Sequence, residues 1–306
     1  MTNSARKKDW VSEQACVCMA RTCNLYCVYC HNPPTGHRPD PARVAAELKA
    51  RGVRAVSLEG GGEPTASPDF FGWIKALKKA GVKRFMLSTN AVALADREFC
   101  RKALAEIEYF TVNFPSHRPD AYARATRSVK FRQALAGLAN LKALGGEEKL
   151  RFFHIVSAVN FRLLPQFAAW AAASFPRAAL VNLTFVRNKG RAVGARGIVP
   201  RYSDAAPYIA LALATLKLKG MKAVVQNVPL CQLRGCEGFS FEFQRWLRGD
   251  KVLEGGVDKP APCKACAACR LAPACCGARA DYLLAHGAGE LRASKKDPAS
   301  IEPERF

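Results

Sequence analysis

The 306-residue chain lacks an apolar run long enough to cross a bilayer, and it shows no charged and apolar leader ahead of its first predicted strand. We therefore expect a soluble, cytoplasmic protein with no membrane partner. Acidic residues are also scarce, because 25 Asp and Glu face 47 Lys and Arg and leave a formal net charge of +22. Such an excess attracts polyanions, so the partners it suggests are an acidic peptide or a nucleic acid. The basic residues do not alternate with aromatic ones, and charge alone argues only weakly for nucleic acid.

Cysteine, in contrast, is abundant, with 13 residues, ten of which fall in two groups. In a reducing compartment such groups are better explained as metal ligands than as disulfides. The first group, Cys23, Cys27 and Cys30, has the spacing C-x3-C-x2-C and lacks a fourth ligand, since His31 adjoins Cys30 and is badly placed to complete the same tetrahedron. Three thiolates predict an iron-sulfur centre with one open iron, and a zinc knuckle is the alternative.

This spacing, with the aromatic Tyr29 directly before the last cysteine, resembles the signature of the radical S-adenosylmethionine (radical SAM) superfamily. The resemblance implies a radical SAM oxidoreductase or maturase with a 4Fe-4S cluster on Cys23, Cys27 and Cys30, and SAM bound at the open iron. It further implies an electron donor such as flavodoxin or ferredoxin. SAM would be cleaved reductively to a 5'-deoxyadenosyl radical that abstracts hydrogen from the substrate.

A glycine-rich turn, Gly60 to Pro64, follows a short apolar strand predicted over 53–58. Glycine permits close backbone approach, and barrel enzymes build their sites at the carboxyl ends of strands. Gly61-Gly62-Glu63 resembles the Gly-Gly-Glu motif of the family. By that resemblance, Glu63 and the backbone of Gly61 and Gly62 would bind the methionine ammonium of SAM.

Three further residues are candidates for cofactor contacts. Ser88 and Asn90, at the end of a strand predicted over 82–88, resemble a family position that contacts the methionine or ribose part of SAM, although a helix cap explains them equally well. Arg127 is a candidate partner of the cofactor carboxylate, because guanidinium binds carboxylates bidentately. A solvated arginine at a helix end is the alternative.

Strands and helices alternate along the first two thirds of the chain. Strands are expected over 11–20, 53–58, 82–88, 109–114, 150–159 and 178–186, with helices between them. This regularity predicts parallel pairing with right-handed crossovers, and the family resemblance favours a partial (β/α)6 TIM-type barrel over a doubly wound sheet. We expect a lead-in over 1–13, a radical SAM core over 14–200, and a small cysteine-rich C-terminal module over 201–306.

The second cysteine group lies in that module. The run Cys266-x2-Cys269-x5-Cys275-x-Gly277 resembles the auxiliary-cluster region of radical SAM enzymes with a SPASM or twitch extension. The resemblance implies one auxiliary 4Fe-4S cluster, because Arg279 stands where a SPASM pattern would have another cysteine. The implied ligands are Cys231, Cys266, Cys269 and Cys275. Cys263, Cys276 and Cys236 are alternates, and a zinc ribbon is the alternative to a cluster.

Enzymes with such extensions often modify peptides or build peptide-derived cofactors, and the positive charge suits an acidic peptide substrate. Modification of tRNA is a second possibility, which predicts salt-sensitive RNA binding. A non-enzymatic, zinc-stabilised nucleic-acid-binding protein is a third. It accounts for the charge and the cysteines, but it leaves Gly61-Gly62-Glu63 unexplained.

Overall fold

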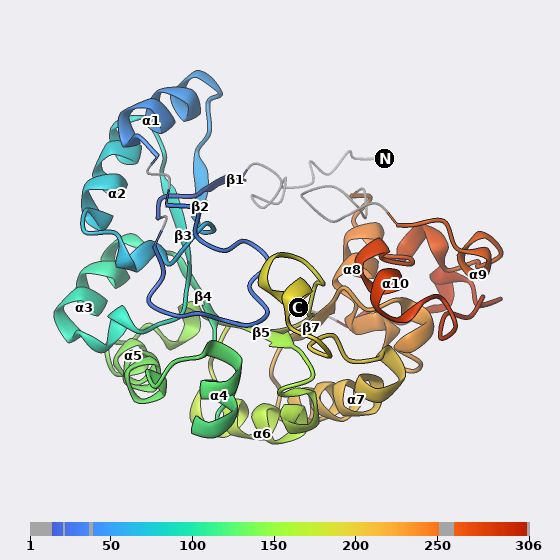
Figure 1. Ribbon diagram of the computed structural model, residues 1–306. Coiled ribbons are helices and arrows are strands. Elements are labelled where there is room, and N and C mark those ends of the chain that lie inside the picture. Colours follow the sequence, from blue (N-terminus) through green and yellow to red (C-terminus); the bar gives the residue numbers. More distant parts are fainter. Residues whose placement is uncertain (1–13, 21, 37–38, 251–259, 305–306) are drawn as a thin grey trace, which may run out of the picture. The chain divides into compact units, whose positions relative to one another are not determined.

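The computed structural model of the protein describes residues 14–20, 22–36, 39–250 and 260–304. The lead-in expected over 1–13 lies outside the described residues. Seven strands form one sheet in the order β1-β2-β3-β4-β5-β6-β7, which is also their order along the chain (Figure 1). The predicted parallel α/β fold is confirmed. Six strands belong to the βα units expected for the core, and the seventh, β7, lies within a further strand expected over 221–227. Among the described helices, none has both the length and the apolarity needed to cross a membrane.

The chain divides into two compact units. Unit 1 comprises Met1–Asn24, Asn32–Val112 and Gln133–Lys149, and unit 2 comprises Leu25–His31, Asn113–Arg132 and Leu150–Phe306. The boundary expected near residue 200 therefore falls inside unit 2. Cys23 belongs to unit 1, whereas Cys27 and Cys30 belong to unit 2.

Unit 1 contains the first four strands, which pair in parallel in the registers β1–β2, β2–β3 and β3–β4. Helices α1, α2 and α3 lie along one side of β1 to β3 (Figure 1). The elements are β1 (Gln14–Val17), α1 (Pro41–Ala50), β2 (Ala55–Leu58), α2 (Phe70–Lys79), β3 (Arg84–Thr89), α3 (Arg97–Glu106), β4 (Tyr109–Asn113) and most of α5 (Phe131–Ala143).

Local sequence explains the helices of unit 1. In α2, Phe70, Trp73, Ile74 and Leu77 recur at helical spacing and are all buried, so one apolar stripe faces the sheet. Helix α3 begins where the Asp96 side chain accepts hydrogen bonds from two first-turn amides, which is the usual role of an N-cap aspartate.

Unit 2 contains β5 (Leu150–Val156), β6 (Leu180–Phe185) and β7 (Ala223–Gln226), again paired in parallel. Along β5, buried and half-buried residues alternate, as expected for a strand with two unlike faces. The helices α6 and α7 pack against each other. The helices of this unit are α4 (Pro119–Thr126), α6 (Leu164–Ser174), α7 (Tyr202–Leu218), α8 (Phe241–Leu247), α9 (Lys264–Ala267) and α10 (Ala280–His286).

Two elements differ from the sequence-based expectation. Strand β1 covers Gln14–Val17 within the 11–20 expected, of which 11–13 lie outside the described residues. Helix α4 was not expected at all, because it is only eight residues long. Two of its four buried positions are alanines, so its apolar periodicity is weak, and it ends at Arg127 in the left-handed conformation with φ 49°.

Candidate functional site

The glycine turn after β2 lies directly on the backbone that precedes Cys23. Gly60, Gly61 and Gly62 all have positive φ, with values of 69°, 63° and 148°. A Cβ atom on Gly62 would stand 2.3 Å from the Thr22 carbonyl oxygen. The Glu63 amide donates to that same oxygen at 2.8 Å. Only glycine permits this approach, which brings the turn against the residue that precedes the first cysteine.

Glu63 is buried and its carboxylate is fully engaged within unit 1. It accepts hydrogen bonds from the amide and hydroxyl of Thr65, from the Thr89 hydroxyl at 2.6 Å and from the Asn90 amide at 2.8 Å. Burial raises the pKa of Glu63, and these hydrogen bonds oppose the rise. The side chain ties the glycine turn to the end of β3. Sequence reasoning did not anticipate that Thr65 and Thr89 bind the Glu63 carboxylate, although both lie within two residues of predicted site residues.

The two predicted residues at the end of β3 have different surroundings. Asn90 is buried, and its Nδ2 donates to Asn24 Oδ1 at 2.6 Å. Ser88 donates to Glu59 Oε2 at 3.3 Å. Asn24 was not predicted, although its place inside the cysteine motif was a signal. The bond to Asn90 links the residue after Cys23 to the same strand end that Glu63 anchors.

In unit 2, helix α4 holds the loop that carries Cys27 and Cys30. The Tyr26 amide donates to the Thr126 carbonyl and the Val28 amide to the Ala125 carbonyl, both at 2.9 Å. These carbonyls belong to the last turn of α4, where the helix itself supplies no donor. The loop therefore uses the free end of a helix as its support.

A second segment closes on the same loop from the β6 side. The Arg191 amide donates to the Cys30 carbonyl at 2.9 Å. A Cβ atom on Gly190 would lie 2.4 Å from that carbonyl oxygen, so this position also requires glycine. The guanidinium of Arg191 stacks 3.7 Å above the ring centroid of Tyr26, and that of Arg127 lies at 5.7 Å. Arg127, a predicted carboxylate partner, thus faces an aromatic ring beside Cys27.

Tyr29 is buried beneath the cysteine loop. Its hydroxyl donates to Asn113 Oδ1 at 3.3 Å, at the end of β4. Burial is the main cause that holds the pKa of Tyr29 well above its ordinary value, so the phenol stays neutral. The ring is a fixed apolar wall of the loop.

The second cysteine group shows a shared pattern of hydrogen bonding to sulfur. Four thiols each accept a main-chain N–H. Leu230 and Gly277 donate to Cys275 Sγ at 3.2 and 3.3 Å, and Ser294 donates to Cys269 Sγ at 3.3 Å. The amides of Arg292 and Ala278 donate to Cys231 and Cys266. These four are the ligands that the family resemblance implied.

These thiols also lie close enough to one another to affect each other's pKa. Burial is the first cause that raises the pKa of Cys231, and the nearby Cys275 and Cys269 raise it further. Burial raises the pKa of Cys266 to about 12, with Cys263 and then Cys275 adding to it. For Cys275 the pKa is lowered, chiefly because the Cys276 thiol donates to its sulfur.

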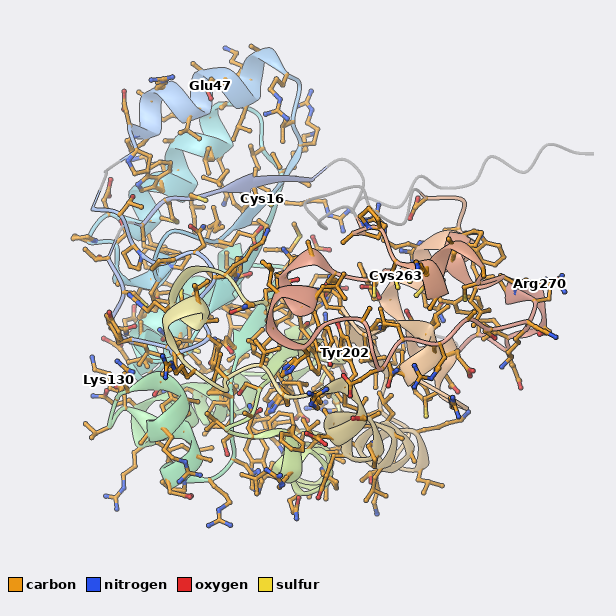
Figure 2. All side chains as sticks on the ribbon, turned by 45° about the vertical axis from the view of Figure 1, so that its right-hand side comes forward. Cys16, Glu47, Lys130, Tyr202, Cys263 and Arg270 are labelled. Carbon is orange, nitrogen blue, oxygen red and sulfur yellow. The ribbon has the colours of Figure 1, made fainter. Side chains whose placement is uncertain are left out.

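The alternates differ from this set. Cys276 is fully buried, donates to its neighbour Cys275 and lies within reach of the Gly277 carbonyl. Cys236 has Glu237, Glu304 and Lys217 nearby rather than other thiols. Cys263 adjoins Cys266 and stays a candidate. Figure 2 shows Cys263 within the cysteine-rich segment and Arg270 at its outer end.

The donor chemistry of the four thiols fits an iron-sulfur cluster. Amide N–H groups directed at cysteine sulfurs tune such clusters by stabilising thiolate charge. In the described part of the chain, no three His, Cys, Asp or Glu side chains converge on a point that would hold a single metal ion.

Arg279 occupies the position where a SPASM pattern would have another cysteine, and it has a structural role. It forms a buried ion pair with Asp281 and donates to the carbonyls of Asn227 and Val186. Asp281 in turn accepts from the Asn188 amide at 2.7 Å. Within unit 2 the pair joins the cysteine-rich segment to the ends of β6 and β7.

Comparison with known families covers the glycine turn and the first cysteine group. Residues 17–160 match the sequence model described as the radical SAM superfamily. This part of the chain is therefore similar to radical SAM domains. Its bounds include Cys23, Cys27, Cys30 and the Gly61-Gly62-Glu63 turn.

Among curated relatives, GTP 3',8-cyclase of Vibrio cholerae serotype O1 is 27% identical over 162 residues, which cover 48% of this chain and 47% of the relative. The chain thus spans about half the length of the curated relatives it matches. The curated relatives are named as enzymes, and the likeness concerns about half of each chain.

Solved structures extend the fold comparison beyond the radical SAM domain. Streptococcus suis SuiB bound to S-adenosylmethionine aligns with 94% of this chain and 77% of its own, at a TM-score of 0.58 and 14% identity. The anSMEcpe enzyme with bound AdoMet and Cp18Cys peptide aligns with 78% and 66%, at a TM-score of 0.57 and 15% identity. At this identity the likeness concerns the fold, and it supports the open, TIM-type arrangement of the parallel sheet.

Proposed function

We propose that the protein is a radical SAM enzyme with one auxiliary iron-sulfur cluster, acting on a peptide or on a peptide-derived cofactor precursor. The observation that carries the radical SAM assignment is the three-cysteine motif without a fourth ligand, inside residues 17–160 that match the superfamily. Cys23, Cys27 and Cys30 would hold a 4Fe-4S cluster. When bound, this cluster and SAM would supply the 5'-deoxyadenosyl radical that abstracts hydrogen from the substrate.

The glycine turn would bind the methionine end of SAM through its backbone. Gly61 and Gly62 carry no side chain, so a ligand can approach the backbone of the turn closely. Glu63 would keep this backbone in place, since its carboxylate is committed to Thr65, Thr89 and Asn90. The backbone of the turn, rather than the Glu63 carboxylate, would therefore bind the SAM ammonium. Glu63 would chiefly hold the turn in position.

The other predicted cofactor residues keep narrower roles. Tyr29 would form an apolar wall beside Cys30, because its hydroxyl is already bonded to Asn113. Ser88 and Asn90 would contact SAM from the end of β3. Arg127 would present positive charge beside the cysteine loop, where it lies over the Tyr26 ring.

An auxiliary 4Fe-4S cluster on Cys231, Cys266, Cys269 and Cys275 is the second part of the proposal. Main-chain N–H bonds to all four sulfurs support it, and the thiols influence one another electrostatically. Such a cluster would accept an electron from a substrate radical or anchor the substrate.

A peptide substrate is favoured by the names of two structural neighbours. One form of SuiB is bound to the precursor peptide SuiA, and anSMEcpe is bound to the Cp18Cys peptide. The charge of +22 makes an acidic peptide the best electrostatic match. The same charge supports tRNA modification as the second candidate. A flavodoxin or ferredoxin donor and a cytoplasmic location stay predictions.

The test begins with anaerobic purification and analysis of iron, sulfide and zinc. We expect iron and sulfide in equal amounts, close to eight of each per chain for two clusters, and production of 5'-deoxyadenosine when SAM and a reductant are added. A protein that binds zinc alone and leaves SAM intact would contradict the proposal and favour a zinc-stabilised binding protein. Salt-sensitive tRNA binding without peptide turnover would favour the second candidate.

A further inference from the structure

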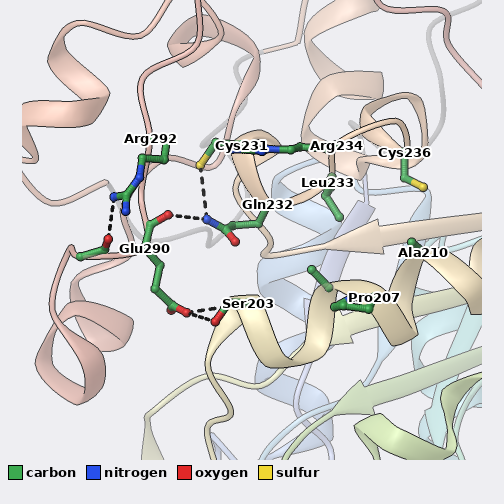
Figure 3. Close-up of a pocket in the computed structure, with 12 residues that line it drawn as sticks. Ser203, Pro207, Ala210, Cys231, Gln232, Leu233, Arg234, Cys236, Glu290 and Arg292 are labelled. Atoms are coloured by element: carbon green, nitrogen blue, oxygen red, sulfur yellow. Dashed lines mark hydrogen bonds between the residues drawn. The ribbon is translucent and has the colours of Figure 1, made fainter.

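A cavity of about 480 Å³ lies beside Cys231 in unit 2. Three segments form its walls, namely the first turns of α7, the 3-10 turn Leu230–Gln232 with the residues that follow it, and the stretch Gly289–Arg292. Figure 3 shows Arg292, Cys231 and Arg234 along one rim, with Ser203, Pro207 and Ala210 along the opposite one. Because Cys231 lines the cavity and is a proposed ligand of the auxiliary cluster, the cavity lies next to that cluster.

The polar framework of the cavity is well ordered by hydrogen bonds. Gln232 Nε2 donates to the Glu290 carbonyl at 2.6 Å, and the Arg292 amide donates to Cys231. The Glu290 carboxylate accepts from the amide and hydroxyl of Ser203 and from the Tyr282 hydroxyl. These bonds lower the pKa of Glu290 although burial opposes them, so the carboxylate stays ionised.

Two guanidinium groups at the rim carry charge that no carboxylate neutralises within the described residues. Arg292 Nη1 donates only to the carbonyls of Gly289 and Leu291. Arg234 forms no ion pair among the described residues, and both side chains are exposed. Guanidinium binds carboxylate with two parallel N–H bonds, so two such groups at one cavity make a carboxylate the matching ligand.

The remaining lining favours a peptide side chain over RNA. Ala206, Pro207, Ala210 and Leu233 form an apolar floor suited to the methylene groups of Glu. Among the described residues, no aromatic side chain lines the cavity, whereas single-stranded RNA is usually held by stacking its bases on aromatic rings. Because Pro207 has no amide proton, the Ser203 carbonyl loses its helical donor at this wall.

We propose that this cavity binds an acidic side chain of the peptide substrate, with Arg234 and Arg292 holding its carboxylate beside Cys231. The inference rests on the proposed function for its substrate class and adds the site and the chemistry of recognition. It makes the cavity a docking point that keeps the substrate next to the auxiliary cluster.

The test measures binding of a fluorescein-labelled hexaglutamate peptide to the anaerobically purified full chain by fluorescence anisotropy. We expect tighter binding of hexaglutamate than of hexaglutamine. R234Q and R292Q should each weaken hexaglutamate binding by about tenfold or more, as expected for the loss of a charge-assisted hydrogen bond. E290Q should strengthen it, because one repelling charge is removed.

R196Q is the matched control, since Arg196 is exposed in the same unit and does not line the cavity. It should bind hexaglutamate like the unaltered protein. If R196Q loses as much as R234Q, binding reflects overall charge and the proposal fails. Unchanged hexaglutamate binding in the R234Q/R292Q double variant would also overturn the proposal. The proposal would likewise fail if tRNA displaced hexaglutamate and the binding of tRNA itself depended on both arginines.

Iron content and SAM binding, measured on every variant, separate this inference from the proposed function. Both should be unchanged in R234Q and R292Q, because these side chains are exposed and the amide of residue 292 remains to donate to Cys231. A protein that selectively binds hexaglutamate through these arginines and holds no iron would refute the enzyme assignment and leave the cavity assignment standing.

Discussion

The two cysteine groups are held in different ways. In the first group, the backbone of the loop from Leu25 to His31 is fastened by the end of α4 and by Gly190–Arg191. In the second group, the sulfurs themselves accept amide hydrogens from segments near residues 230, 277, 292 and 294. A compact motif needs a rigid support for its loop, whereas a dispersed ligand set needs the fold to bring its donors and sulfurs together.

The sharpest way to break this comparison is to remove a thiol from the first group. C27A should abolish 5'-deoxyadenosine formation, because two thiolates do not retain the cluster that binds SAM. Chromatographic detection of 5'-deoxyadenosine measures it, and C16A, an exposed thiol outside both groups, should keep full activity. Cleavage by C27A at the native rate would refute the site assignment.

The complementary change in the second group should be milder for SAM chemistry. C275A should lose roughly half of the bound iron, since one of two four-iron clusters is removed, and should still cleave SAM without productive turnover. The neighbouring C276A should keep its iron, because Cys276 donates to Cys275 and receives no amide bond of the shared pattern. Equal iron loss in both variants would mean that the ligand was assigned to the wrong member of the pair.

The supports of the first group can be weakened without touching a sulfur. G62A forces a Cβ atom to within 2.3 Å of the Thr22 carbonyl at a φ of 148°. Strain of about 1–3 kcal/mol corresponds to a roughly 5- to 150-fold loss in SAM affinity, measured by equilibrium binding. G194A, whose Cβ would meet open space, should bind SAM normally.

The parallel change on the unit 2 side is G190A. Its Cβ atom would lie 2.4 Å from the Cys30 carbonyl, so the cysteine loop must shift. We expect faster loss of iron from the first group when the protein is exposed to a chelator, with the second group unaffected. A chelation time course that matches the unaltered protein would mean that the Gly190 segment does not support the loop.

The smallest effect concerns neither cysteine group and serves as a baseline for stability. His154 on β5 is buried, and its ring centroid lies 4.1 Å from that of Phe167. Burial lowers the pKa of His154 to about 3, so the ring stays uncharged in the folded protein. The unfolded chain takes up a proton near pH 6.5 and the folded chain does not, so stability should fall as the pH drops below 6.5. The loss should reach about 2 kcal/mol at pH 5.

Urea unfolding at pH 7 and pH 5 measures this loss. H154L should be less stable at pH 7, because the Phe114 carbonyl loses its contact with the ring, and it should show a much smaller change between the two pH values. H286L is the control and should keep the wild-type decrease. If H154L retains the full decrease, another group is responsible for the acid sensitivity.

Much of the fold could be read from local patterns. The helices α1, α2 and α3 lie between strands as expected, because caps, glycines and apolar stripes act over one or two turns. Helix α4 could not be read in this way. Its eight residues carry few large apolar side chains, and its importance lies in the two carbonyls that it offers to the cysteine loop.

The same division applies to the candidate site. The cysteine motif and the glycine turn are short, so their spacing is visible in the chain and indicates their chemistry. The partners of Glu63, by contrast, come partly from a different strand, and the assignment of its carboxylate changed once Thr89 and Asn90 were seen to occupy it. Long-range hydrogen bonds leave no periodic trace, which is why the contacts made by Asn24, Thr89 and Gly190 were not anticipated.

By itself, the order of residues determined the parallel α/β class, the three-thiolate motif and the likeness to the radical SAM superfamily, because these depend on spacing along the chain. Only the tertiary structure decided which thiols of the second group share amide donors and which guanidinium groups border a common cavity. Those relations join residues as far apart as Ser203 and Glu290, and it takes chain folding, with the burial that drives it, to bring such residues within hydrogen-bond distance.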